Sequence, residues 1–121
     1  MSLLPFKFKP APSVTPLNPQ LEALLQEYSI EVMPRTAAKV EDFRALLPEG
    51  TRVYVAHIEG TPIDEMVQTA ARLARDGYKV MPHFPARIIK DQAMLADWIA
   101  RYKGEANVDQ ALLLAGGVTK P

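Results

Sequence analysis

Apolar residues recur along the chain with two alternating periods, and these predict alternating helices and strands. Spacings of three and four residues, typical of helices, occupy residues 19–28, 37–47, 62–76 and 92–102. Short runs rich in β-branched, aromatic or leucine side chains, typical of strands, occupy residues 28–34, 52–58, 79–85 and 110–117. The predicted order is one helix, then four strands with a helix between each pair.

Residues that commonly begin and end helices support these boundaries. Asn18 stands before the first helix and Asp91 before the last, where their side chains can accept from free backbone N–H groups. Thr61 is expected to do the same for residues 62–76, with a proline at the first helical position. Gly77 is expected to end that helix in the left-handed conformation.

Strands that alternate with single helices predict an α/β fold with a parallel sheet. The short apolar strands further predict a sheet covered on both faces. Two architectures fit: a small open sheet, or the first half of a TIM (βα)8 barrel. The barrel is favoured because unusual residues fall where the strands end, which is where barrels hold their chemistry. These residues are Glu31, His57, His83, Gly116 and Gly117.

The proposed domain organisation is a proline-rich arm, residues 1–20, followed by one half-barrel domain, residues 21–121. Prolines interrupt the apolar residues of the arm, so no signal peptide is expected. No run reaches the roughly 18 apolar residues of a membrane span. A complete barrel needs about 250 residues, so a half-barrel or a truncated chain is expected.

Composition narrows the functional classes. Lys plus Arg and Asp plus Glu each number 14, and a net charge of zero gives no support to nucleic-acid binding. There is no cysteine, which excludes disulfides and thiolate metal sites and fits a reducing cytoplasm. The two histidines do not make a histidine-rich metal site, and none is expected.

Glu31 is the main candidate for catalysis, because it is a lone carboxylate in an otherwise apolar strand. Alternation places Ile30 and Val32 towards the helices and Glu31 towards the barrel interior. An apolar interior raises the pKa of a carboxyl group, and such a glutamate can give a proton to a substrate near neutral pH. The alternative is a structural ion pair between a buried Glu31 and Arg35, Arg87 or another cation.

Three motifs resemble the methylenetetrahydrofolate reductase family: SIEVMPRT in residues 29–36, VMPHFPAR in residues 80–87 and ALLLAGG in residues 111–117. The resemblance spans about residues 28–121, roughly the first half of that enzyme. It implies a (βα)8 barrel that reduces 5,10-methylenetetrahydrofolate to 5-methyltetrahydrofolate. It also implies an FAD cofactor that is reduced by NADH or NADPH.

Within this resemblance, Glu31 matches the catalytic acid that opens the folate ring to an iminium, and His83 matches a flavin-contacting histidine. Two departures from the family matter: Ala56 and His57 occupy a region that usually supplies a threonine, and Gly117 stands where an aspartate is usual. The implied FAD-contacting residues are therefore Ala56, His57, His83, Gly116 and Gly117. The departures also allow a divergent subfamily with altered or absent flavin.

Cationic loop residues are the candidates for substrate binding. Arg35, Arg87 and Lys90 follow the first and third predicted strands and can bind a glutamate tail or a phosphate, or remain solvated. Three interpretations stay open: a folate reductase or its N-terminal half, a non-catalytic half-barrel that self-associates, and another barrel enzyme using Glu31 as an acid. A homo-oligomer is expected because open sheet edges favour pairing.

Overall fold

The computed structural model describes residues 18–117. The helices are α1 (Pro19–Leu24), α2 (Pro34–Ala37), the 3-10 helix η1 (Phe43–Ala45), α3 (Ile63–Arg75) and α4 (Gln92–Ala106). The strands are β1 (Ser29–Val32), β2 (Arg52–Val55), β3 (Lys79–Pro85) and β4 (Leu112–Leu114). The predicted alternation is confirmed, whereas the strands β1, β2 and β4 are shorter than expected and α1 ends at Leu24.

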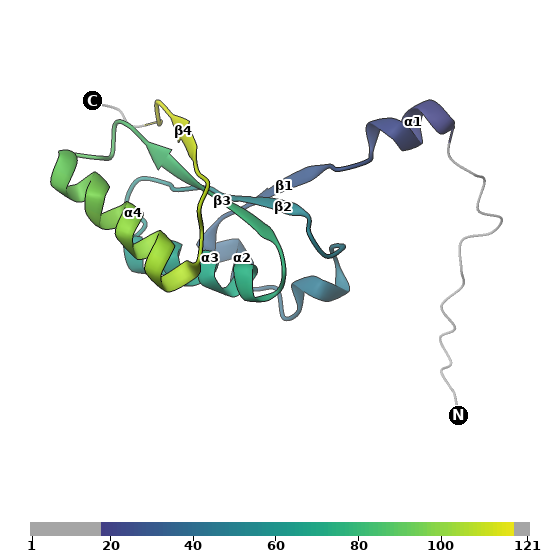
Figure 1. Ribbon diagram of the computed structural model, residues 1–121, viewed down its shortest axis with the longest axis horizontal. Coiled ribbons are helices and arrows are strands. Elements are labelled where there is room, and N and C mark those ends of the chain that lie inside the picture. Colours follow the sequence, from purple (N-terminus) through teal and green to yellow (C-terminus); the bar gives the residue numbers. More distant parts are fainter. Residues whose placement is uncertain (1–17, 118–121) are drawn as a thin grey trace.

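The four strands form one parallel sheet in chain order, β1-β2-β3-β4. Helices α2, α3 and α4 lie on the same face of this sheet (Figure 1). The α/β class with parallel βα units is therefore confirmed, and closure into half of a barrel stays a prediction.

The core lies between the sheet and the helices. Strand alternation turns Val53, Val55 and Val80 towards the helix layer, where all three are buried. Helix α3 contributes the apolar stripe that covers them. Its buried residues are Met66, Val67, Ala70 and Leu73.

The opposite face of the sheet carries no helix in the described part of the chain (Figure 1). The prediction that both faces are covered is therefore wrong for residues 18–117. Strand β4 is exposed on both faces: Leu112, level with His83 on the helix-free face, is 37% exposed, and Leu113, level with Phe84 on the helix face, is 76% exposed. None of the helices in these residues is long and apolar enough to cross a bilayer.

Most of the predicted helix ends are confirmed. The Asn18 side chain accepts from the N–H of Gln20, and the Asp91 side chain accepts from the N–H of Met94. Gly77 has a φ of +94°, the left-handed conformation expected after α3. The prediction for Thr61 is wrong: α3 begins at Ile63 and its N-cap, Pro62, makes no side-chain cap.

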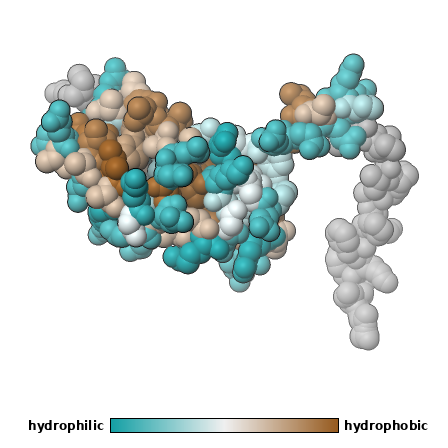
Figure 2. Space-filling model, in the orientation of Figure 1, coloured by the Kyte–Doolittle hydropathy of each residue, from teal (hydrophilic) through white to brown (hydrophobic). Residues whose placement is uncertain are grey.

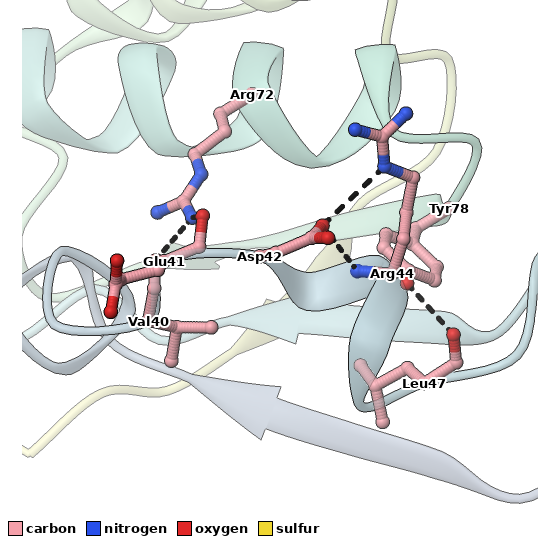
Figure 3. Close-up of polar contacts among 7 residues, drawn as sticks. All are labelled: Val40, Glu41, Asp42, Arg44, Leu47, Arg72 and Tyr78. Carbon is pink, nitrogen blue, oxygen red and sulfur yellow. Dashed lines mark hydrogen bonds and ion pairs between the residues drawn. The ribbon is translucent and has the colours of Figure 1, made fainter. Parts of the chain in front are cut away.

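The predicted helix of residues 37–47 is also wrong, because α2 and η1 are separate short helices. The Arg72 guanidinium donates to the carbonyls of Val40 and Glu41 (Figure 3). It also donates to the Ala37 carbonyl and lies over the Phe43 ring. A continuous helix would use the Val40 and Glu41 carbonyls for its own hydrogen bonds. Arg72 therefore stabilises the non-helical path between α2 and η1.

The segment from η1 to β3 is held by two further contacts in the same region (Figure 3). Asp42 is extended and is the N-cap of η1. Its side chain accepts hydrogen bonds from the backbone N–H and the side chain of Arg44. The Tyr78 hydroxyl donates to the Leu47 carbonyl at 2.9 Å. Burial raises the pKa of Tyr78, so this hydroxyl stays a donor at neutral pH.

The last three residues of the SIEVMPRT motif, residues 34–36, have a local structural role. Pro34 is the first residue of α2. The Thr36 hydroxyl donates to the Met33 carbonyl and accepts from the Met33 N–H. These contacts turn the chain directly from β1 into α2 and so fix the end of the strand that carries Glu31.

Candidate functional site

Glu31 and His83 lie together on the helix-free face of the sheet. In the parallel register Glu31 is level with Tyr54 of β2 and Met81 of β3, so His83 lies two residues further along the same face. Glu31 Oε1 is 3.1 Å from His83 Nε2. The atoms are within ion-pair distance, although the ring nitrogen is not aligned with the carboxylate as a hydrogen bond requires.

Tyr54 completes this group, and the sequence analysis did not identify it. It lies on β2, between the strands that carry Glu31 and His83. Its ring meets the imidazole of His83 edge-on, with ring centroids 6.4 Å apart. The strand pattern indicates its position: Val53 and Val55 face the helices, so the alternation turns Tyr54 to the other face.

The environment of Glu31 differs from the one expected. Its side chain is 58% exposed, whereas that of His83 is only 10% exposed. The expectation of a carboxyl group enclosed by apolar residues is therefore wrong within residues 18–117. The reason is that the face carrying Glu31 has no second layer over it (Figure 1).

His57 belongs to the opposite side of the sheet. Its ring stacks on the indole of Trp98 in α4, with centroids 4.9 Å apart. Its Nε2–H donates to the Thr61 carbonyl at 3.1 Å, and its Nδ1 is buried without a partner among the described residues. Burial lowers the pKa of His57, as does the nearby His83, while the Thr61 hydrogen bond opposes them. The structure therefore does not bring His57 together with Glu31.

Of the two glycines after β4, Gly116 has a conformational role. Gly116 has a φ of +97°, and a Cβ there would lie 3.1 Å from the Pro85 Cβ. The Arg87 guanidinium donates to the Gly116 carbonyl at 3.1 Å, and the Arg87 N–H donates to the Ala115 carbonyl. Arg87 thus binds its own chain here. A Cβ on Gly117 would meet open space.

The remaining candidates lie at the same carboxyl end of the sheet. Ala56 is buried, and its N–H donates to the Val32 carbonyl, which extends the β1–β2 pairing by one residue. Arg35 and Lys90 are exposed and form no ion pair within the described range. Neither cation forms an ion pair with Glu31 in the described part of the chain.

The fit of these residues to FAD is incomplete. His83 is the one predicted flavin contact whose ring lies on the helix-free face beside Glu31. His57 packs in the helix layer, and the Gly116 conformation is explained by the turn and by Pro85. No group of three or more potential metal ligands occurs in residues 18–117. Glu31 and His83 are thus the predicted site residues that the structure brings together on this face.

No protein-family model matches the sequence. The candidate site is therefore defined by its own geometry.

Proposed function

We propose that the chain is a methylenetetrahydrofolate reductase-like oxidoreductase, or the part of one that carries the acid, and that it acts in the cytoplasm. The observation that supports this most is the 3.1 Å approach of Glu31 Oε1 to His83 Nε2. The two residues come from different motifs of the family resemblance, SIEVMPRT and VMPHFPAR. Their convergence on one face of the sheet is what a shared site requires.

In this proposal Glu31 gives a proton to a ring nitrogen of 5,10-methylenetetrahydrofolate. The bond from that nitrogen to the bridging carbon breaks, and an iminium forms at the other nitrogen. NADH or NADPH supplies a hydride to the iminium carbon, which gives 5-methyltetrahydrofolate and the oxidised nucleotide. His83 then returns a proton to Glu31 from solvent after its ring turns to align Nε2 with the carboxylate, which is 3.1 Å away.

Tyr54 supports the substrate in this arrangement. Its ring lies on the same face, next to His83, and offers an aromatic surface for a flat heterocycle. Arg35, on the first turn after β1, is an exposed cation that can bind the glutamate tail of a folate. The proposal assigns no step to FAD, because the described residues do not assemble its cradle.

Binding of a reduced folate is the experiment that tests this function. Isothermal titration of the protein with 5-methyltetrahydrofolate should show saturable binding that Tyr54→Ala weakens. Tyr28→Ala serves as the control, because Tyr28 lies before β1 and away from the pair. The flavin absorbance of the purified protein reports separately on FAD. Absence of folate binding would refute the proposal.

A second proposal concerns self-association. The open edge at β4 holds three leucines, of which Leu113 is 76% exposed. Eight strands close a barrel of ordinary size, and two copies supply eight. We expect β4 of one copy to pair in parallel with β1 of another, since this pairing satisfies both free edges.

A further inference from the structure

A pocket of about 420 Å³ lies at the amino end of the sheet, and neither Glu31 nor His83 lines it. It is formed by the link between α1 and β1, residues 25–28, by the residues that lead into β2, 48–52, and by Lys79 at the start of β3. We call it the link pocket. Its volume is within the range of about 300–1,000 Å³ that is typical of small-ligand sites. Figure 2 shows apolar surface over α4 and β4 and on α1, whereas the surface where the chain from α1 enters the sheet is mainly hydrophilic.

Two cations lie side by side in the link pocket. Arg52 and Lys79 are register partners on adjacent strands, so their side chains leave the sheet on the same face. Both are exposed, and neither forms an ion pair with a carboxylate of the described residues. Like charges at neighbouring positions of adjacent strands repel each other. An anionic group bound between them would remove this repulsion.

Two carboxylates line the same pocket. Glu27 belongs to the link, and Glu49 belongs to the residues before β2. Within residues 18–117, the ion pairs include neither of them. The pocket therefore presents charges of both signs that do not pair with one another. A ligand with one negative and one positive group has a partner for each.

The backbone at Glu27 is a second observation on the same pocket. Glu27 has a φ of +55°, in the left-handed region, just after the end of α1. Glycine is the residue that local structure favours at such a position, and a residue with a long side chain is uncommon there. A glutamate in this conformation is explained if its carboxylate is needed in the pocket.

The link pocket also has an apolar wall. Leu25 and Tyr28 line it and are 48% and 41% exposed. They offer a contact for an apolar group, and the ring of Tyr28 can also contact an ammonium group. The pocket thus combines cations, carboxylates and an apolar surface.

We propose that the link pocket binds a free α-amino acid with an apolar side chain. The carboxylate of the ligand lies between Arg52 and Lys79, its ammonium group faces Glu27 and Glu49, and its side chain lies against the apolar wall. This site is separate from the Glu31–His83 pair, and the proposal does not depend on the folate function.

Isothermal titration tests the class of ligand. The protein should bind L-leucine saturably. The analogue 4-methylpentanoate lacks the ammonium group, and 3-methylbutylamine lacks the carboxylate. Each should bind at least tenfold more weakly than L-leucine, because each leaves two charges of the pocket without a partner. An analogue that binds as tightly as L-leucine, or no saturable binding of L-leucine at millimolar concentration, would overturn the proposal.

Substitutions at exposed positions test the location of the site. Arg52→Gln and Glu49→Gln should fold, and each should raise the dissociation constant for L-leucine at least tenfold. Arg75→Gln and Glu59→Gln are the matched controls, because both residues are exposed and lie outside the pocket. They should bind L-leucine like the wild type. Equal dissociation constants for all four variants would overturn the assignment to this pocket.

Glu27→Gly separates binding from stability. Glycine adopts the left-handed conformation without a steric cost, so the melting temperature of the unliganded protein should rise. The dissociation constant for L-leucine should increase at least tenfold in the same variant. A variant that binds L-leucine as the wild type does would overturn the role of Glu27 in the site.

Discussion

The imidazole of His57 stacks on the indole of Trp98, with centroids 4.9 Å apart and an interplanar angle of 29°. This contact joins the loop after β2 to α4. Burial favours the neutral imidazole, while the hydrogen bond from Nε2–H to the Thr61 carbonyl favours the protonated one, and burial is the larger of the two effects. The chain has a single tryptophan, so tryptophan fluorescence reports on the surroundings of Trp98, which include the His57 ring.

Stability should therefore fall in mild acid. Burial lowers the pKa of His57 below its ordinary value of 6.5 in the folded protein. As the pH falls below 6.5 the unfolded chain binds a proton that the folded chain does not, so the free energy of unfolding decreases until the folded pKa is reached. Urea titrations at several pH values, followed by Trp98 emission, measure this decrease.

His57→Gln provides the control for that experiment. It keeps a polar side chain but removes the titrating group, so the decrease between neutral and mildly acid pH should become smaller. Glu105 does not interfere with this comparison. Arg101 lowers the pKa of its carboxyl group, so its contribution to the free energy of unfolding is lost only at more acid pH. If the stability of the His57 variant depended on pH as that of the wild type does, the loss of stability in mild acid could not come from His57.

Arg72 should be important for stability although it is far from the candidate site. Arg72→Met keeps much of the apolar stem over Phe43 but leaves the carbonyls of Ala37, Val40 and Glu41 without their donor. The expected loss is about 1–3 kcal/mol, typical of hydrogen bonds to a charged group. Thermal and chemical unfolding measure it.

Arg75→Met is the matched control, because Arg75 lies on the same helix and is exposed. Exposed substitutions of this kind usually change stability by less than about 0.5 kcal/mol. Equal effects of the two variants would show that the Arg72 contacts do not hold the connection between β1 and β2.

The paired glycines after β4 should respond differently to alanine. Gly116→Ala forces a side chain into the left-handed region and against Pro85, and should cost about 1–3 kcal/mol. Gly117→Ala meets open space and should be nearly neutral. Unfolding experiments on both variants measure the difference, and equal stabilities would refute the conformational explanation of Gly116.

Local sequence features predicted much of this fold. The predicted caps were correct: Asn18 and Asp91 cap the helices that follow them, and Gly77 ends α3 in the left-handed conformation. A cap depends only on residues within one turn, so the local sequence is enough to predict it. The helix expected over residues 37–47 failed because Arg72, more than thirty residues away, binds the carbonyls there. No local pattern carries that information.

The candidate site was predictable in part for a similar reason. Glu31 and His83 stood out as ionisable residues in apolar strands, and the parallel register explains why they meet. Whether His57 faces the helices or the other side depends on the path of the chain after β2, whose last pairing contact is the hydrogen bond from the Ala56 N–H to the Val32 carbonyl. The exposure of Glu31 depends on what lies over the sheet, and the strand pattern does not specify it.

The central claim is that Glu31 acts as the acid in the reduction of a folate. The most direct measurement is the rate of NAD(P)H oxidation that depends on 5,10-methylenetetrahydrofolate, compared among the wild-type protein, Glu31→Gln and Glu59→Gln. Glu59 is exposed in the loop after β2 and serves as the matched carboxylate. Loss of general acid catalysis should slow Glu31→Gln by about 10² to 10⁴-fold, with Glu59→Gln and the melting temperatures unchanged. A Glu31→Gln protein that turns over like the wild type, or a wild-type protein without folate-dependent oxidation, would contradict the claim.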